Sequence, residues 1–221
     1  MELIASQLRL YLVTDPVLCR ARGVVDTVRE AVAGGVTMVQ LRDKDATSRE
    51  RVAVGHALMR ALEGTGVPLV INDDIDAALA IGAHGVHLGQ SDLSPERIRE
   101  RLGPSAIVGV SCETIAHAAT ADARVVDYVG LGPVFATSTK PDHAPAMGLR
   151  MLAAARAATS VPAVAIGGIQ LANLAQVLAT GVHGVAVVSA ICGQPSPRDA
   201  AQALSTFVVT SDDAVPDRIS T

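Results

Sequence analysis

The feature that most constrains the fold is a regular alternation of short hydrophobic segments with Ala-rich segments of helical pattern. The short segments are rich in β-branched residues and too brief for buried helices, so each predicts a β-strand. Helices between successive strands predict parallel strands joined by crossover connections, which indicates the α/β class. The eight expected strands lie at residues 8–14, 37–41, 68–71, 85–88, 106–110, 125–131, 162–166 and 184–188.

An internal repeat indicates that one structural unit recurs along the chain. Residues 79–89 (LAIGAHGVHLG) and 178–188 (LATGVHGVAVV) each contain a helix end, a glycine, a His-Gly-Val turn and a strand, and residues 31–41 are a weaker copy. A doubly wound open sheet shows the same alternation, but eight β/α units favour a closed (β/α)8 TIM barrel. We expect this barrel to form a single domain at residues 1–208, followed by a polar, disordered tail at residues 209–221.

Several helix boundaries are visible as local signals. Thr47 and Glu50 have the spacing of a capping box, and Ser94 precedes a proline that suits the first turn of a helix. Gly82 and Gly181 follow helical segments and can end them in the left-handed conformation.

Composition and charge exclude several functions. The net charge is −4, with a pI of about 5.8, so no overall positive field attracts nucleic acid or an anionic membrane. The three cysteines lack metal-ligand spacing, and the N-terminal residues lack the basic and apolar regions of a targeting segment. No apolar segment approaches the ~20 residues of a membrane-spanning helix. These features predict a reduced, cytoplasmic protein.

Polar clusters follow seven of the expected strands. Because the C-terminal ends of the strands converge on one face of a closed barrel, we expect these clusters to form a single site. The clusters lie at residues 40–44, 72–74, 89–92, 111–113, 137–140, 167–168 and 189.

Helix capping is the ordinary explanation for polar residues after a strand. It does not account for Arg42, Lys44 and Asp92, because the helices that follow them already have N-caps. Either Asp73 or Asp74 could cap the next helix, so a capping role for Asp73 stays open.

The residue types in these clusters indicate the chemistry of the site. The chain contains 16 arginines but only two lysines, Lys44 and Lys140, and both follow hydrophobic segments. Asp73 and Asp92 could offer the one or two carboxylates with which proteins hold Mg²⁺, with water and phosphate oxygens completing the shell. The two lysines and Arg42 on the same face would balance a polyphosphate. These residues predict a metal-bound diphosphate.

A second anion site is expected beside the first. Gly167 and Gly168 follow the seventh strand, and Val188 and Ser189 follow the eighth. Barrels commonly bind a phosphate at this position through backbone amides and a helix N-terminus.

The histidines favour structural roles over catalysis. His84 and His183 lie in matching Gly-x-His-Gly turns, and His87 alternates within a strand. No histidine pairs with a serine or cysteine as a nucleophile and base, so covalent catalysis is not expected.

Eight motifs together resemble the thiamine phosphate synthase family in order and spacing: YLVTD, QLRDK, INDD, GVHLGQSD, GVS, YVGLGPVFATSTK, AIGGI and GVAVVSAI. The resemblance extends to about Cys192, and QLRDK and GPVFATSTK are its most specific parts. It implies a Mg²⁺-dependent enzyme that joins a hydroxymethylpyrimidine diphosphate to a thiazole phosphate and releases pyrophosphate. The implied mechanism is dissociative: a pyrimidinylmethyl cation forms first, and the thiazole nitrogen then attacks it.

The resemblance also implies roles for individual residues. The pyrimidine diphosphate would contact Gln40, Leu41, Arg42, Asp43, Lys44, Asn72, Ser111 and Lys140, of which Arg42, Lys44, Ser111 and Lys140 would be catalytic. The metal ligands would be Asp73 and Asp92. The thiazole phosphate would contact Thr137, Ser138, Thr139, Gly168, Val188 and Ser189. The family resemblance further implies a homodimer.

Two positions depart from the family pattern, and three alternatives stay open. His84 stands where the family has Asp in the Gly-Ala-x-Gly turn, a difference that we expect to be structural. The family often has His at the third position of the fifth loop, where this chain has Glu113. The alternatives are a thiazole tautomerase-like paralogue, a non-catalytic phosphate-binding regulator and a sugar-phosphate isomerase or epimerase on the same fold. Retention of the QLRDK motif, Asp73, Asp92 and Lys140 argues against the tautomerase, which needs no diphosphate site.

Overall fold

The structure is a computed structural model that describes residues 3, 5–137, 139 and 144–212. Its eight strands pair in parallel in chain order, and the first strand also pairs with the last, so the sheet closes into a barrel. The expected (β/α)8 barrel is confirmed. The strands are β1 (Leu10–Val13), β2 (Met38–Leu41), β3 (Leu69–Asn72), β4 (Gly85–Leu88), β5 (Ile107–Cys112), β6 (Tyr128–Leu131), β7 (Ala163–Ile166) and β8 (Gly184–Val187).

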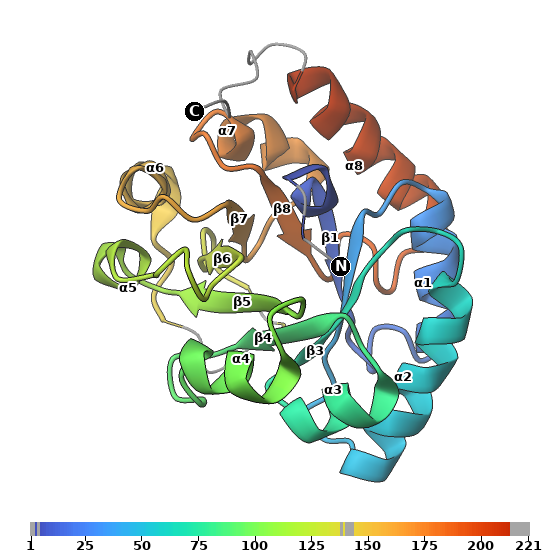
Figure 1. Cartoon of the computed structure of the whole chain (residues 1–221). Coiled ribbons are helices and arrows are strands. Elements are labelled where there is room, and N and C mark those ends of the chain that lie inside the picture. The colour runs from blue at the N-terminus through green and yellow to red at the C-terminus, as the bar shows by residue number, and fades with distance from the viewer. Residues whose placement is uncertain (1–2, 4, 138, 140–143, 213–221) are drawn as a thin grey trace.

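The helices form an outer layer around the strands, with α8 beside α1 where the ring closes (Figure 1). The α-helices are α1 (Val24–Ala33), α2 (Ser48–Leu62), α3 (Ile75–Ile81), α4 (Pro95–Leu102), α5 (Ile115–Ala119), α6 (Gly148–Ala157), α7 (Leu174–Leu178) and α8 (Pro197–Asp212). Two short 3₁₀ helices, η1 (Ala5–Leu8) and η2 (Leu171–Asn173), precede β1 and α7. None of the helices in the described ranges has the length and hydrophobicity needed to cross a bilayer.

The strands alternate between two hydrophobic cores, as the period of two in a β-strand requires. In β1, Leu10 and Leu12 pack in the layer between strands and helices, whereas Tyr11 and Val13 belong to the cluster inside the barrel. The interior cluster also contains Tyr128, whose side chain is fully buried. Side chains from alternate strand positions therefore fill part of the interior of the barrel.

The internal repeat folds into two matching turns. His84 Nδ1 accepts a hydrogen bond from the backbone N–H of Leu69 at 3.0 Å, and His183 Nδ1 accepts one from Ala163 at 3.0 Å. Each histidine thus holds the first residue of the preceding strand. The expected turn roles of these two histidines are confirmed.

Most of the expected helix boundaries are also confirmed. Thr47 and Glu50 form a reciprocal capping box, with Glu50 Oε2 accepting the Thr47 N–H at 2.9 Å. Gly82 ends α3 in the left-handed conformation. Ser94 occupies the N-cap of α4, but its side chain accepts no backbone N–H from the first turn. Gly181, also at positive φ, lies two residues beyond the C-cap of α7.

The last helix differs from the expected domain boundary. α8 continues to Asp212, so its final turn takes in residues 209–212, which the sequence assigned to the tail. A helical pattern and a polar tail are hard to separate where a helix ends in Ser and Asp. Residues 213–221 lie outside the described residues.

Candidate active site

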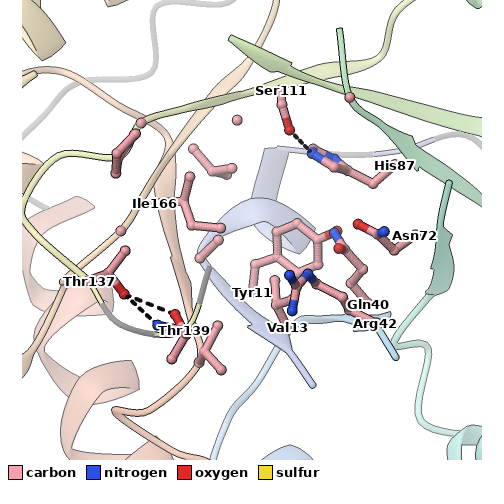
Figure 2. A pocket seen from close by; sticks show the side chains of 18 of the residues that line it. Tyr11, Val13, Gln40, Arg42, Asn72, His87, Ser111, Thr137, Thr139 and Ile166 are labelled. Carbon is pink, nitrogen blue, oxygen red and sulfur yellow. Dashed lines mark hydrogen bonds between the residues drawn. The ribbon is translucent and has the colours of Figure 1, made fainter. Parts of the chain in front are cut away.

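A cavity of about 420 Å³ opens at the C-terminal ends of the strands, and every strand contributes a residue to its wall. Figure 2 shows side chains from different strands pointing into the same space, among them Tyr11, Gln40, Asn72, His87 and Ser111. The closed barrel thus brings together residues that are far apart in the sequence.

Most of the sequence-predicted site residues line this cavity. They are Gln40, Arg42, Lys44, Asn72, Asp73, Asp92, Ser111, Thr137, Thr139, Gly168, Val188 and Ser189. Ser138 and Lys140 lie outside the described residues. The roles of all these residues stay predictions, because no bound ligand tests them.

Leu41 and Asp43 do not line the cavity, and their predicted contacts with the diphosphate stay predictions. Leu41 is the last residue of β2, and its buried side chain packs in the outer hydrophobic layer. Asp43 Oδ1 accepts the backbone N–H groups of Asp45 at 3.2 Å and Ala46 at 3.0 Å. Alternation along the strand turns the Leu41 side chain outward, and the Asp43 carboxylate organises the loop.

The capping question at Asp73 and Asp74 is settled by hydrogen bonds. Asp74 Oδ1 accepts the Ala77 N–H at 2.8 Å as the N-cap of α3, and its other oxygen pairs with Arg51. Arg51 also donates to the backbone oxygen of Asp43 at 2.9 Å. Asp74 therefore has a structural role, and Asp73 keeps its carboxylate for the cavity.

Asp73 and Asp92 form a pair of neighbouring carboxylates. Asp73 has a φ of 61° and donates its N–H to the His87 backbone oxygen at 2.9 Å, which holds it at the rim. Asp92 Oδ2 accepts the Gly89 N–H at 2.6 Å. Although Asp73 is open to the cavity, partial burial and the Asp92 carboxylate raise its pKa to about 6, whereas the Asn72 amide and Lys44 act in the opposite direction. Two carboxylates that repel one another form a site that a cation would stabilise.

The two carboxylates fit Mg²⁺ better than they fit a metal ion whose ligands all come from the protein. Within the described part of the chain, no group of three or more His, Cys, Asp or Glu side chains could hold a metal ion. Mg²⁺ typically takes one or two carboxylates and fills its other positions with water and phosphate oxygens. Asp73 and Asp92 are therefore suited to hold Mg²⁺ together with a phosphorylated ligand.

The positive side of the cavity is supplied by the β2–α2 loop. Arg42 donates its backbone N–H to Thr14 Oγ1 at 3.0 Å, which ties this loop to the end of β1. Arg42 and Lys44 both line the cavity, and Lys44 is close enough to lower the pKa of Asp73. The cations and the carboxylate pair thus lie near one another, as binding of a metal diphosphate requires.

The opposite side of the cavity is built from hydroxyl groups and backbone. Thr137 and Thr139 share a hydrogen bond of 2.9 Å between their hydroxyls (Figure 2). Gly168 has a φ of 65°, and a Cβ there would lie 2.7 Å from the Cβ of Phe135, so the β6 and β7 loops pack closely only around a glycine. Asn173 donates to the Gly168 backbone oxygen at 3.0 Å. This wall of hydroxyls and glycine backbone suits a monophosphate.

Sequence reasoning missed the placement of His87. Its Nδ1 lies 2.8 Å from the Tyr128 hydroxyl, and its Nε2 lies 2.9 Å from Ser111 Oγ, so it lies at the floor of the cavity. Tyr11 also lines the cavity and lay outside the predicted clusters, whereas Gln90 and Glu113 line it as members of the clusters at residues 89–92 and 111–113, without a predicted role of their own. The alternation of strand residues 85–88 was a usable signal, because it turns His87 to the face opposite Val86.

Known proteins resemble this chain over most of its length. The family model described as thiamine monophosphate synthase matches residues 10–191. A thiamine-phosphate synthase of Azorhizobium caulinodans is 47% identical over 204 residues, which cover 92% of this chain and 96% of the relative. A thiamine-phosphate synthase of Vibrio parahaemolyticus is 49% identical over 205 residues, covering 90% of this chain and 98% of the relative.

Solved structures agree with the sequence relatives. A thiamine phosphate pyrophosphorylase from Pyrococcus furiosus superposes with a TM-score of 0.84 and 36% identity, covering 93% of this chain and 98% of that one. A 3-hexulose-6-phosphate synthase, at 19% identity and a TM-score of 0.64, shares the fold alone. The matched residues include the loops that form the cavity, and the chain belongs to the thiamine monophosphate synthase family.

Proposed function

We propose that this protein is a thiamine phosphate synthase. It would condense 4-amino-2-methyl-5-(diphosphooxymethyl)pyrimidine with 4-methyl-5-(2-phosphooxyethyl)thiazole to give thiamine phosphate and pyrophosphate. The observation that carries this proposal is a single cavity with one wall of cations and paired carboxylates and another of hydroxyls and glycine amides. Family membership supports the same reaction.

The diphosphate would bind between Arg42 and Lys44 on one side and the carboxylate pair on the other. Asp73 and Asp92 would hold Mg²⁺, which when bound neutralises charge on the departing pyrophosphate. Arg42 and Lys44 would stabilise the same charge as the C–O bond breaks, and Lys140 would join them by family resemblance.

The thiazole phosphate would bind at the wall formed by Thr137, Thr139, Gly168, Val188 and Ser189. Anchoring its phosphate there would hold the thiazole nitrogen near the exocyclic carbon of the pyrimidine. Positioning two reactants in one cavity removes much of the entropic barrier to their reaction.

The absence of a suitable nucleophile among the described lining residues supports a dissociative mechanism. Cys112 is buried outside the cavity wall, and burial raises the pKa of its thiol to about 12, so it stays protonated and unreactive. Ser111 lies beside His87, but each also belongs to a hydrogen-bonded chain that leads away into the barrel. The leaving group therefore departs with electrostatic assistance instead of displacement by the protein.

The proposed setting is the cytoplasm, and the proposed assembly is a homodimer. The first follows from composition and the second from family resemblance alone. Sedimentation of the purified protein would test the assembly.

The test of the function is release of pyrophosphate by the purified protein with both substrates and Mg²⁺, each omitted in turn. We expect release only when all three are present, with thiamine phosphate formed in equal amount. Folded protein that binds either substrate but releases no pyrophosphate would contradict the proposal and favour the tautomerase or the non-catalytic regulator.

A further inference from the structure

A chain of hydrogen bonds crosses the interior of the barrel beneath the cavity. Gln40 Nε2 lies 2.6 Å from the Tyr11 hydroxyl, and this hydroxyl lies 2.9 Å from that of Tyr128. The Tyr128 hydroxyl lies 2.8 Å from His87 Nδ1, and His87 Nε2 lies 2.9 Å from Ser111 Oγ. The five side chains come from β2, β1, β6, β4 and β5, so the chain joins two opposite parts of the cavity wall.

Four of the five side chains line the cavity, and the central one, Tyr128, does not. Gln40 and Ser111 line the cavity, whereas Tyr128 is fully buried and absent from the wall. The β5 residue Gly109 leaves room for the Tyr128 ring, since a Cβ there would lie 2.1 Å from the ring carbon that bears the hydroxyl. The fold therefore accommodates the Tyr128 hydroxyl at a buried point outside the cavity wall.

The direction of the chain follows from what each group can donate. The Gln40 amide nitrogen can only donate, so the Tyr11 hydroxyl accepts from it. Within the described residues, the Tyr11 proton has the Tyr128 oxygen as its acceptor, and leaving a buried hydroxyl unsatisfied is costly. Tyr128 then donates to His87 Nδ1, and His87 must carry its proton on Nε2 and donate it to Ser111.

This direction determines what the cavity offers to a ligand. The Gln40 amide oxygen is left as an acceptor, and the Ser111 hydroxyl proton is left as a donor. An aminopyrimidine needs both: an acceptor for its exocyclic amino group and a donor for a ring nitrogen. The polarity of the two ends is linked through Tyr128, because a reversed chain would exchange donor and acceptor.

We propose that Tyr128 is a positioning residue that fixes the hydrogen-bonding polarity of Gln40 and Ser111 toward the aminopyrimidine ring. The choice of ligand rests on the proposed function, but the polarity of the chain does not. Mutual polarisation along such a chain makes its links cooperative, so that losing one link weakens the others.

The first experiment needs no substrate. In the full-length protein labelled with ¹⁵N, we expect His87 to show one neutral tautomer, with Nε2 protonated; its signals are assigned by their loss in His87→Gln. Tyr128→Phe removes only the hydroxyl and should shift the Nδ1 signal or mix the tautomers. An Nδ1-protonated His87, or signals unchanged in Tyr128→Phe, would overturn the proposal.

The second experiment separates the two substrates kinetically. For Tyr128→Phe we expect kcat/KM for the pyrimidine diphosphate to fall about tenfold, as for loss of one hydrogen bond, and the thiazole phosphate KM to change less than about twofold. Thr37→Val is the matched control, because it removes a half-buried hydroxyl bonded to Leu10 at the other end of the barrel. An equal loss for both substrates, or the same loss in Thr37→Val, would indicate a general structural defect and overturn the positioning role.

A double variant tests whether the links act as one unit. Tyr11→Phe breaks the neighbouring link, so Tyr11→Phe combined with Tyr128→Phe should lose little more activity than the worse single variant. Losses that multiply, to about a hundredfold if each single variant costs tenfold, would show independent residues and contradict the chain. If the wild-type protein makes no thiamine phosphate, the proposed function fails, and the ¹⁵N experiment still decides the polarity of the chain.

Discussion

The two ends of the barrel use similar polar side chains in different ways. At the N-terminal end, His84 and His183 accept strand N–H groups, and Asp127 Oδ2 accepts from Arg99 at 2.6 Å and from the Val108 N–H at 2.7 Å. Their hydrogen bonds are made within the protein, and they hold strands in register.

At the C-terminal end, polar groups of like charge lie next to one another. Asp73 and Asp92 are adjacent carboxylates, and the pKa of Asp73 is raised to about 6 by burial and by Asp92. Such an arrangement is unfavourable without a ligand, which is common at functional sites. The same residue type thus stabilises the fold where its partners belong to the protein and serves binding where they do not. Substitutions at the N-terminal end of the barrel should therefore lower stability, and substitutions at the C-terminal end should lower activity.

The largest expected effect is at the cavity. Lys44→Ala should lower the rate of the chemical step about 10²-fold, as for loss of one group that stabilises developing charge. Its exposed side chain contributes little to folding, so the free energy of unfolding should stay the same. Single-turnover pyrophosphate release and urea unfolding measure the two quantities. An unchanged rate would remove Lys44 from leaving-group stabilisation.

The converse effect is expected at the N-terminal end. Asp127→Ala leaves the Arg99 guanidinium and the Val108 N–H without this acceptor, which should lower the free energy of unfolding by about 2 kcal/mol. Activity per folded molecule should not change. Urea unfolding and active-site titration at low temperature would check this, and a selective loss of kcat would break the distinction between the two ends.

A smaller effect is expected for the carboxylate pair. Asp92→Asn removes one of the two proposed metal ligands and should raise the Mg²⁺ concentration for half-maximal rate about tenfold. Because it also removes repulsion from Asp73, the melting temperature in the absence of Mg²⁺ should not fall. Metal titration and thermal unfolding give both readings; an unaltered titration counts against ligation by Asp92.

The smallest effect concerns pH and His84. Burial lowers the pKa of His84 below its ordinary value, so the unfolded chain binds the proton more readily than the folded one. Its contribution to stability is present above about pH 6.5 and declines as the pH falls through that value. His84→Asn should therefore lose about 1 kcal/mol near pH 7.5 and progressively less toward pH 5.

The measurement is the difference in urea unfolding between His84→Asn and wild type across this pH range. The comparison with wild type is needed because Asp73 changes the stability of both proteins in the opposite direction. Its raised pKa makes its ionised form costly, so its contribution to the free energy of unfolding improves as the pH falls toward 4. The exposed His56 in α2 provides the control substitution His56→Asn. A constant difference between His84→Asn and wild type would exclude His84 from the pH dependence.

Local patterns predicted the elements better than the contacts of the site. All eight strands were expected near their observed positions, and β4 was expected at its observed bounds. The sequence also placed most of the cavity residues, because the C-terminal ends of strands converge in any closed barrel. It did not distinguish Asp43 from its neighbours Arg42 and Lys44, since the direction of a loop side chain depends on turn contacts such as those that Asp43 Oδ1 accepts from two N–H groups.

By itself the sequence determined the fold class, the repeated β/α unit and the end of the barrel that carries the chemistry, because these follow from periodicity and from residue types next to strand ends. Only the tertiary structure decided that Asp74 caps a helix while Asp73 faces Asp92, and that His87 joins Ser111 to Tyr128. The His87 contacts link three different strands, and Asp73 and Asp92 follow two different strands of the closed barrel. Their partners are chosen by strand register and side-chain direction, which no local pattern in the chain encodes.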